Sequence, residues 1–234
     1  MREVVLDTET TGLDPRDGDR VVEIGCIELI NHIPTGKHFH VYINPERPMP
    51  EEAFKVHGLS DEFLKDKPVF AAIAKDFCEF IGEDPLVIHN ASFDIGFLNA
   101  ELARLDGMPH IAMERAIDTV RLARGKFPGA QVSLDALCKR FNIDLSARIK
   151  HGALLDAELL AEVYLELVGG RQQGLGLTGA DGDGQALIAL PQVRGPARPP
   201  RPHAPTEAEL AAHAQFLAKL KDPLWLRQVA EAAD

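Results

Sequence analysis

Cysteine, positive charge and long apolar runs are all scarce in this chain of 234 residues. The three cysteines, Cys26, Cys78 and Cys138, lie far apart, which excludes a metal knuckle or a disulfide framework and favours buried thiols in a reducing cytoplasm. No apolar run approaches the roughly 18–20 residues that cross a bilayer. The first residues enter a strand-like run without the organisation of a signal peptide. We therefore expect a cytoplasmic protein with no membrane partner.

The shortage of basic residues bears on nucleic-acid binding. The net charge is −11, and because seven basic and seven acidic residues balance from position 171 onward, residues 1–170 carry all of it. A protein that held DNA mainly by neutralising phosphates would have the opposite balance. If the chain handles DNA, we expect weak binding that relies on metal ions or on a partner.

The pattern that is present predicts an α/β domain over residues 1–170. Alternating or β-branched apolar residues predict strands at residues 4–7, 21–29, 38–43 and 86–88. Apolar residues at helical spacing predict helices at residues 69–81, 94–105, 133–141 and 152–168. Strands first, then strands interleaved with helices, indicate a mixed sheet.

The composition changes after residue 170. Glycine and proline supply 14 of the 37 residues from 169 to 205, which predicts a flexible linker at 171–205. A terminal segment, 206–234, follows. Thr206 and Glu209 have capping-box spacing, and Leu210, Leu217 and Leu224 recur every seven residues until Pro223 interrupts the pattern.

The first acidic motif, Asp7 and Glu9, directly follows an apolar run. Side chains alternate along a strand, so the two carboxylates point to one face. Unless a cation lies between them they repel, and carboxylates without cysteine favour Mg²⁺ or Mn²⁺. The alternative is a solvated strand end that happens to be acidic.

Two further acidic positions follow along the chain. Asp94 comes where a helix should begin, so it is either a functional carboxylate or a helix N-cap. His151 and Asp156 are five residues apart, about 140° off on an ideal helix, and cannot share a helical face. Gly152 therefore predicts that His151 lies on a loop and Asp156 on the next helix. The alternative is an exposed histidine beside a solvated acidic residue.

In order, the three clusters read Asp-x-Glu, Asp and His-x₄-Asp. This arrangement resembles the DEDD exonuclease superfamily in its histidine branch, because the tyrosine of the other branch would fall at Gly152. The resemblance implies a ribonuclease-H-like α/β fold, with a five-stranded mixed sheet flanked by helices.

Longer matches narrow the resemblance. The segments at residues 7–12, 39–42, 56–58, 61–64, 87–91, 93–97, 133–138 and 151–156 are similar to those of the epsilon-subunit family of bacterial DNA polymerase III. They span residues 1 to about 170, while the tail is similar in layout only. The resemblance implies a 3′→5′ DNA exonuclease that proofreads for a replicative polymerase.

The resemblance also implies a mechanism. Asp7, Glu9, Asp94 and Asp156 would hold two Mg²⁺ or Mn²⁺ ions about 4 Å apart. One ion would activate a water and the other would stabilise the leaving 3′-oxygen, while His151 would act as general base. The product would be a nucleoside 5′-monophosphate.

Six residues would surround the terminal nucleotide by the same resemblance: Thr10, Glu52, His57, His89, Asn90 and Phe93. Phe93 could equally belong to the core. Selection of mispaired ends need not involve base reading, because a mismatched end frays at lower cost. A linker would deliver that end at high effective concentration.

The tail indicates partners. Residues 172–177, from Gln172 to Leu177, resemble a sliding-clamp-binding peptide, although plain linker is the alternative. The segment 206–234, with Leu224 and Trp225, resembles a peptide that docks on the polymerase alpha subunit, although it could instead pack on its own domain. A small theta-like subunit is a further partner that the resemblance allows.

Two other functions compete with this interpretation. One is a free-standing exoribonuclease of the same branch, but such chains typically stop soon after the last aspartate, whereas this one continues for 78 residues. The other is a non-catalytic tether between clamp and polymerase, which the presence of all five catalytic residue types disfavours.

Overall fold

The central strand of the sheet, β1 (Arg2–Thr10), carries the first acidic motif and pairs with one strand on each side. The computed structural model describes residues 1–146, 150–170 and 204–221. The chain divides into two units, Met1–Leu177 and Thr178–Asp234, which are taken separately. The other elements, in chain order, are η1 (Pro15–Asp17), β2 (Val21–Ile30), β3 (Ile33–Tyr42), α1 (Glu51–His57), α2 (Asp61–Leu64), α3 (Phe70–Ile81), β4 (Leu86–Ile88), α4 (Ala91–Leu102), η2 (Met113–Arg115), β5 (Ala116–Asp118), α5 (Thr119–Lys126), α6 (Leu134–Phe141), α7 (Ala153–Leu167) and α8 (Glu207–Leu217).

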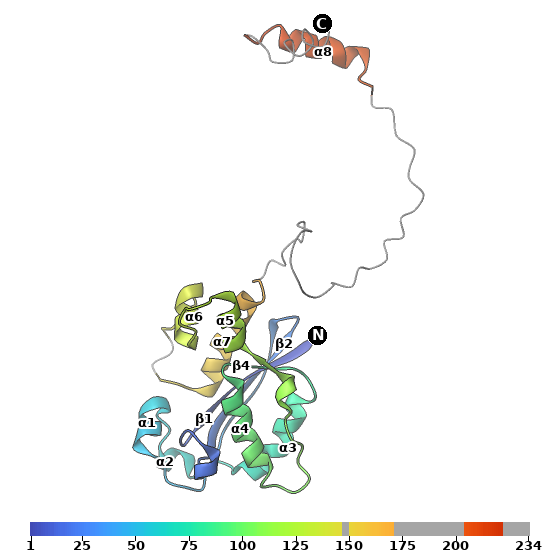
Figure 1. Cartoon of the computed structure of the whole chain (residues 1–234). Coiled ribbons are helices and arrows are strands. Elements are labelled where there is room, and N and C mark those ends of the chain that lie inside the picture. The colour runs from blue at the N-terminus through green and yellow to red at the C-terminus, as the bar shows by residue number, and fades with distance from the viewer. Residues whose placement is uncertain (147–149, 171–203, 222–234) are drawn as a thin grey trace. The chain divides into compact units, whose positions relative to one another are not determined.

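The five strands form one sheet in the order β3-β2-β1-β4-β5, and the predicted mixed sheet of five strands is confirmed. The pairs β1–β2 and β2–β3 are antiparallel, whereas β1–β4 and β4–β5 are parallel. The carboxyl ends of β1, β4 and β5 therefore meet at one edge of the sheet. Chain segments that are far apart in sequence are brought together there (Figure 1).

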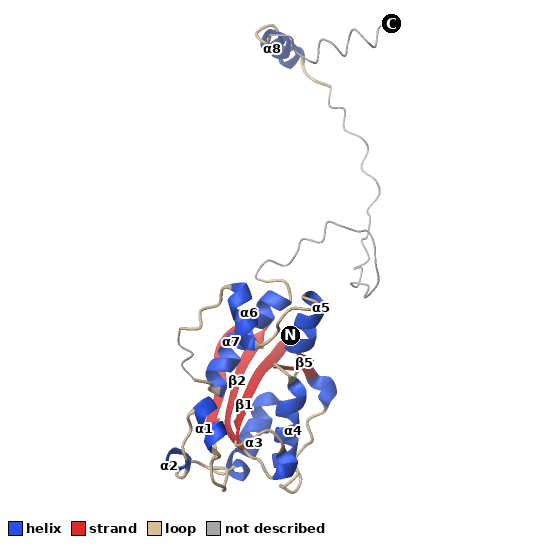
Figure 2. Ribbon diagram, turned by 60° about the vertical axis from the view of Figure 1, so that its left-hand side comes forward, coloured by secondary structure: helices blue, strands red, loops and turns tan. Residues whose placement is uncertain are grey.

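Helices cover both faces of the sheet (Figure 2). On one face, α3 and α4 pack against Val4 and Leu6 of β1, with the fully buried Phe70, Phe77 and Phe97 at the centre. On the other, α5, α6 and α7 pack against Val5. Each buried phenylalanine contributes about 1.5–3 kcal/mol to folding. Both layers hold β1 rigidly, which fixes the side chains at its end.

Six short elements escaped the sequence prediction: β5, α1, α2, α5 and the two 3₁₀ turns η1 and η2. β5 has only three residues, all half-buried, and therefore gives no apolar run. In α1 a single residue, His57, is buried, so its apolar periodicity is weak. The strand predicted at residues 4–7 was too short, because the antiparallel ladder of β1 with β2 continues through polar residues up to Thr10. The strand predicted at 38–43 also began too late, since β3 starts at Ile33, whereas β4 matches its predicted range.

The alternative interpretation of Asp94 as a helix N-cap is wrong. Helix α4 begins at Ala91, after Asn90 in a left-handed conformation (φ 71°), and Asp94 lies inside its first turn. The other helix starts agree closely with prediction: Ser133 caps α6, and Gly152 precedes α7.

In the second unit, the predicted capping box is present at the start of α8. The Thr206 hydroxyl accepts from the Glu209 backbone, and the Glu209 carboxylate accepts from the Thr206 backbone. Most of the predicted linker, the predicted clamp-binding residues 172–177 and the pair Leu224 and Trp225 lie outside the described residues. Within the described ranges, no helix has the length and apolar character that a membrane span requires.

Candidate active site

The side chains of β1 divide between the two faces of the sheet. Val5 points toward α7, and Asp7 and Glu9 follow it on the same face at two-residue intervals. Thr8 points the other way, toward α4, where its hydroxyl donates to Asp94 Oδ1 at 2.8 Å. Because Glu9 is only 8% exposed, its carboxylate has little access to water. The end of β1 thus carries acidic groups toward α7 and a hydroxyl toward α4.

Gly25 lets α7 approach this end of β1. It lies directly opposite Asp7 in the β1–β2 ladder. A Cβ at Gly25 would come within 2.4 Å of the Ala153 backbone, so only glycine accommodates this contact. The first turn of α7 can therefore lie on the sheet and bring Asp156, which is 3% exposed, over the acidic motif.

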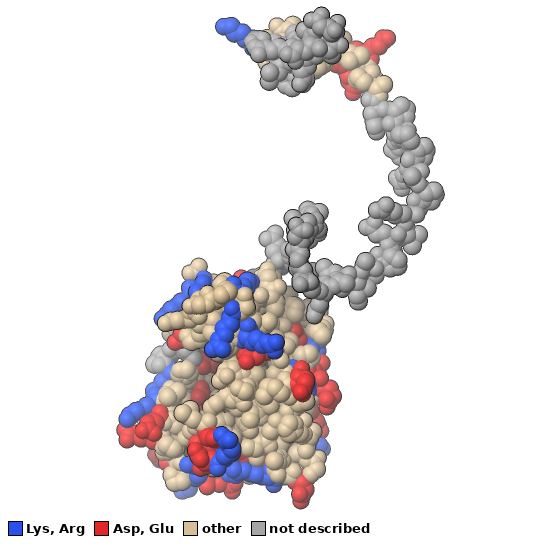
Figure 3. Space-filling model, in the orientation of Figure 1, with Lys and Arg blue, Asp and Glu red and all other residues tan. Residues whose placement is uncertain are grey.

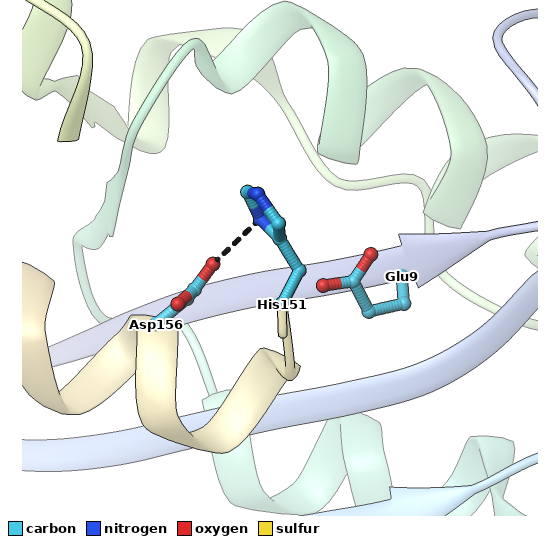
Figure 4. A group of neighbouring side chains, drawn as sticks. All are labelled: Glu9, His151 and Asp156. Carbon is cyan, nitrogen blue, oxygen red and sulfur yellow. Dashed lines mark hydrogen bonds and ion pairs between the residues drawn. The ribbon is translucent and has the colours of Figure 1, made fainter. Parts of the chain in front are cut away.

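His151 lies on the loop before α7, and its side chain is 48% exposed. Its Nδ1 is 3.2 Å from Asp156 Oδ2, and its backbone N–H donates to the carbonyl of Val56 in α1. Ligand atoms of Glu9, His151 and Asp156 all lie within 4.8 Å of one another (Figure 4). The structure thus brings these three predicted residues together.

Asp94 lies on α4, on the opposite side of β1 from this group, and neither Asp94 nor Asp7 belongs to the 4.8 Å cluster. Burial raises the pKa of Asp94 to about 7, and the negative charge of Asp118 adds to the rise while the Thr8 hydrogen bond opposes it. Asp118 ends β5 and accepts from the backbone N–H groups of Asn90 and Val120. Thr8, Gly25 and Asp118 were not predicted from the sequence, although an aspartate followed by a threonine, as at Asp118, is a recognisable signal for the start of a helix.

A cavity of about 330 Å³ opens beside Glu9. Its walls are residues 8–13, which include Thr10, together with Pro50, Glu52, Ala53, Val56, His57 and Phe93. Phe93 also packs on Phe97, with ring centroids 4.9 Å apart, so it serves both the core and the cavity. Four of the six predicted substrate residues therefore line one cavity.

His57 has the properties of a hydrogen-bond donor toward this cavity. Its Nδ1 accepts from the Leu59 backbone N–H at 3.0 Å, which leaves the ring proton on Nε2. Nε2 is buried and makes no hydrogen bond of standard geometry within the described ranges, although the Thr10 backbone is near enough to oppose the effect of burial on the ring. Burial lowers the pKa of His57, which favours the neutral ring.

His89 and Asn90, the other two predicted substrate residues, line a second cavity of about 630 Å³ with Asp118, Val120, Arg121, Arg124, Val132 and Ser133. His89 Nδ1 lies 2.9 Å from the Thr119 hydroxyl. The structure therefore separates the six predicted residues between two cavities, both of which border the N-terminal turn of α4.

The chemistry of these groups fits hard divalent cations. Glu9 and Asp156 are buried carboxylates whose oxygens approach one imidazole, and such groups are costly to hold charged without a compensating cation. Burial also disfavours the anion of Asp94 and raises the pKa of that carboxyl to about 7.

Comparison with known proteins identifies the family of the chain. Residues 4–164 match the model of the RNase_T exonuclease family. DNA polymerase III subunit epsilon of Rickettsia conorii is 53% identical over 226 residues, covering 94% of this chain and 96% of that one. The epsilon subunit of Escherichia coli is 44% identical over 219 residues, covering 91% of this chain and 90% of its own.

Solved structures extend the comparison to the fold. Exonuclease X in complex with 5′ overhanging duplex DNA is 27% identical, with a TM-score of 0.55 over 71% of this chain and 90% of that one. The nuclease domain of 3′hExo, a DEDDh family member bound to rAMP, is 19% identical, with a TM-score of 0.61 over 71% and 91%. The chain therefore belongs to the RNase_T exonuclease family, among the epsilon subunits of DNA polymerase III.

Proposed function

We propose that the site at the end of β1 performs the 3′→5′ exonuclease reaction of this proofreading subunit. The observation that carries the proposal is the cluster of Glu9, His151 and Asp156 within 4.8 Å, next to a cavity that Glu9 itself lines. The match to epsilon subunits covers 94% of the chain, tail included, which favours a polymerase subunit over a free-standing exoribonuclease. Exonuclease X, solved with DNA, supports DNA as the substrate.

Asp7, Glu9, Asp94 and Asp156 would hold two divalent cations, Mg²⁺ or Mn²⁺. Such ions supply a nucleophile at neutral pH and stabilise the charge of the leaving oxygen. The carboxylates come from β1, α4 and α7, so the fold itself sets their separation. Removal of any one of them changes the number of ligands and the charge of the site.

His151 would accept the proton of the attacking water. When Asp156 accepts from Nδ1–H, the free lone pair of the ring is on Nε2. This tautomer can accept a proton at Nε2 and is therefore competent as a base. The half-exposed ring can then release its proton to solvent. The bond between the His151 backbone and Val56 connects the base to α1, which forms a wall of the nucleotide cavity.

The cavity of about 330 Å³ would take the terminal nucleotide. His57 Nε2–H would donate to an oxygen of that nucleotide, and Phe93 would pack on its sugar or base. Thr10 and Glu52 complete the polar wall. Because these contacts read no base edge that distinguishes one nucleotide from another, preference for mispaired ends would come from fraying.

The terminal segment 206–234 would dock on the polymerase alpha subunit, and the linker 171–205 would join it to the exonuclease domain 1–170. In support, α8 and the turn after it expose three large apolar side chains: Leu210, Phe216 and Leu220. Residues 172–177 would bind the sliding clamp. A theta-like subunit is an additional candidate partner. A cytoplasmic location would follow from a role in replication of the bacterial chromosome.

The docking role predicts a selective loss of binding. Leu210→Ala with Phe216→Ala is expected to weaken association with the polymerase subunit, because burial of each side chain contributes about 1.5–3 kcal/mol before ordering costs. The control Arg198→Ala with Arg201→Ala changes the linker and should bind normally. Titration calorimetry decides it, and tight binding by a fragment that ends at Gly170 would contradict the docking role.

The exonuclease function is tested by parallel digestion of single-stranded DNA and RNA of one sequence. We expect Mg²⁺-dependent release of deoxynucleoside 5′-monophosphates and slower release from RNA. Faster degradation of RNA would favour the exoribonuclease alternative, and no hydrolysis of either would contradict both.

A further inference from the structure

The second cavity is lined by two arginines and one acidic residue, Asp118, although the protein as a whole is acidic. Residues 119–141, which span α5 and α6, contain five basic residues and one acidic residue, in a chain with a net charge of −11. Lysine and arginine side chains gather over these two helices on the surface that Figure 3 shows. This local excess runs against the overall balance, and it borders the cavity that His89 and Asn90 line.

Two of these five basic residues, Arg121 and Arg124, line the cavity. Two others have structural contacts elsewhere. Lys126 donates to the last carbonyls of α7, and the Arg140 guanidinium stacks 4.5 Å from the Phe127 ring centroid. Arg121 and Arg124, three residues apart on one face of α5, are exposed and line the cavity. No carboxylate of the described ranges forms an ion pair with either. Their guanidinium groups are available to bind anions.

The cavity lies close to the active-site carboxylates, and this position indicates which anion the arginines would bind. Both cavities border the first turn of α4, since Phe93 lines the smaller and Asn90 the larger. The carboxylates of the active site lie beside the same turn, through Asp94. If the last nucleotide of a strand occupied the smaller cavity, its scissile phosphate would lie at the carboxylates and the preceding phosphates would come near Arg121 and Arg124.

We propose that the larger cavity binds the phosphates of single-stranded DNA on the 5′ side of the scissile bond, with Arg121 and Arg124 as the phosphate-binding residues. This inference rests on the proposed exonuclease function and deepens it. Guanidinium groups bind phosphate oxygens in pairs of hydrogen bonds, which suits a backbone contact without sequence preference. Ser133 and the Asn90 amide supply further hydrogen-bonding groups in the same wall.

The test compares substrates that differ in upstream phosphates. A dinucleotide contains only the scissile phosphate, whereas a hexanucleotide of DNA also fills the larger cavity. The full chain with Arg121→Gln and Arg124→Gln should lose about 10-fold or more in kcat/KM on the hexanucleotide and keep its rate on the dinucleotide. The dependence of log kcat/KM on log salt should also become shallower, by about 0.7 for each phosphate that the variant no longer neutralises.

A matched control removes the same charge elsewhere. Lys75→Gln with Arg104→Gln alters exposed residues on α3 and after α4. This control variant should have the kcat/KM of wild type on both substrates. Binding of a labelled hexanucleotide in EDTA gives a readout without catalysis, and the Arg121/Arg124 variant should bind more weakly than the control. Wild-type hydrolysis of the dinucleotide tests the proposed function separately. An equal length dependence in wild type and variant would overturn the subsite alone.

Discussion

The carboxylates at the two ends of β1 have different neighbours. At the N-terminal end, Arg2 donates to Glu28 and Asp84, and the buried Glu3 accepts from the Tyr164 hydroxyl at 2.7 Å, with His32 Nδ1 also 2.7 Å away. At the C-terminal end, acidic side chains are neighbours of one another and of a single histidine.

The pKa values express this difference. The hydrogen bond from Arg2, with help from Thr35 and Lys37, lowers the pKa of Glu28 to about 2, whereas burial raises the pKa of Asp94 to about 7. One end stabilises its charges with the protein's own groups. At the other end, burial raises the pKa of Asp94 although the Thr8 hydroxyl donates to it, and strongly shifted groups of this kind gather at functional sites.

The largest expected effect comes from the C-terminal end. Asp156→Asn keeps the shape of the side chain and removes its charge, so hydrolysis should fall to the level of a blank. Thermal stability of the metal-free protein should hold or rise, because repulsion with Glu9 is relieved. The control is Glu158→Gln, an exposed acidic residue of the same helix. Substantial turnover by Asp156→Asn in Mg²⁺ would remove Asp156 from the metal site.

A smaller loss is expected from the histidine. His151→Ala should lower turnover by roughly 10²–10⁴, the usual contribution of one general base. Wild-type turnover should rise with pH because a general base must be unprotonated to accept a proton, and the variant should lose that rise. The exposed His38 on β3 offers a control variant, His38→Ala, with normal turnover. A variant at His151 that keeps the wild-type pH profile would refute its role as base.

At the N-terminal end, changes should affect stability and leave activity unaltered. Tyr164→Phe takes a hydroxyl donor from the buried Glu3 carboxylate, so the free energy of unfolding should fall by about 1.5–3 kcal/mol. Tyr42→Phe, the change at the only other tyrosine, is the control and should cost far less. Denaturant titration measures both. A loss of nuclease activity in folded Tyr164→Phe would contradict the claim that the N-terminal end of β1 affects stability alone.

The last prediction is a pH dependence of stability in the metal-free protein. Because folding raises the pKa of Asp94 from 3.8 to about 7, the folded state binds the extra proton between those values. The free energy of unfolding should therefore decline as pH rises from about 4 to about 7. Asp94→Asn should flatten this decline. Melting temperatures in EDTA at several pH values suffice, and an unchanged slope in Asp94→Asn would assign the effect elsewhere.

Long, periodic elements and clustered motifs were predictable from the sequence. The apolar runs of β1, β2 and β4 and the spacing in α3 and α7 are local signals, and so is the position of His151 before α7. The capping box of Thr206 and Glu209 was confirmed because it depends only on neighbouring residues.

What the sequence could not reveal depends on contacts between distant segments. Gly25 matters because α7 crosses it, and Thr8 because α4 brings Asp94 to its hydroxyl. The division of the predicted substrate residues between two cavities is likewise a property of the packed fold. The resemblance predicted that these residues lie near the nucleotide, but it did not predict which of the two cavities each of them lines.

One measurement tests the functional assignment of the C-terminal end most directly: degradation of a primer with a mismatched 3′ end, with Mg²⁺ or with EDTA, by wild type and Asp7→Ala. We expect wild type with Mg²⁺ to remove the mismatched nucleotide faster than a paired one, and EDTA or Asp7→Ala to stop removal in both. Circular dichroism verifies that the variant is folded. Removal of the mismatch at wild-type rate by Asp7→Ala, or in EDTA, would contradict a metal-dependent site at this end of the strand.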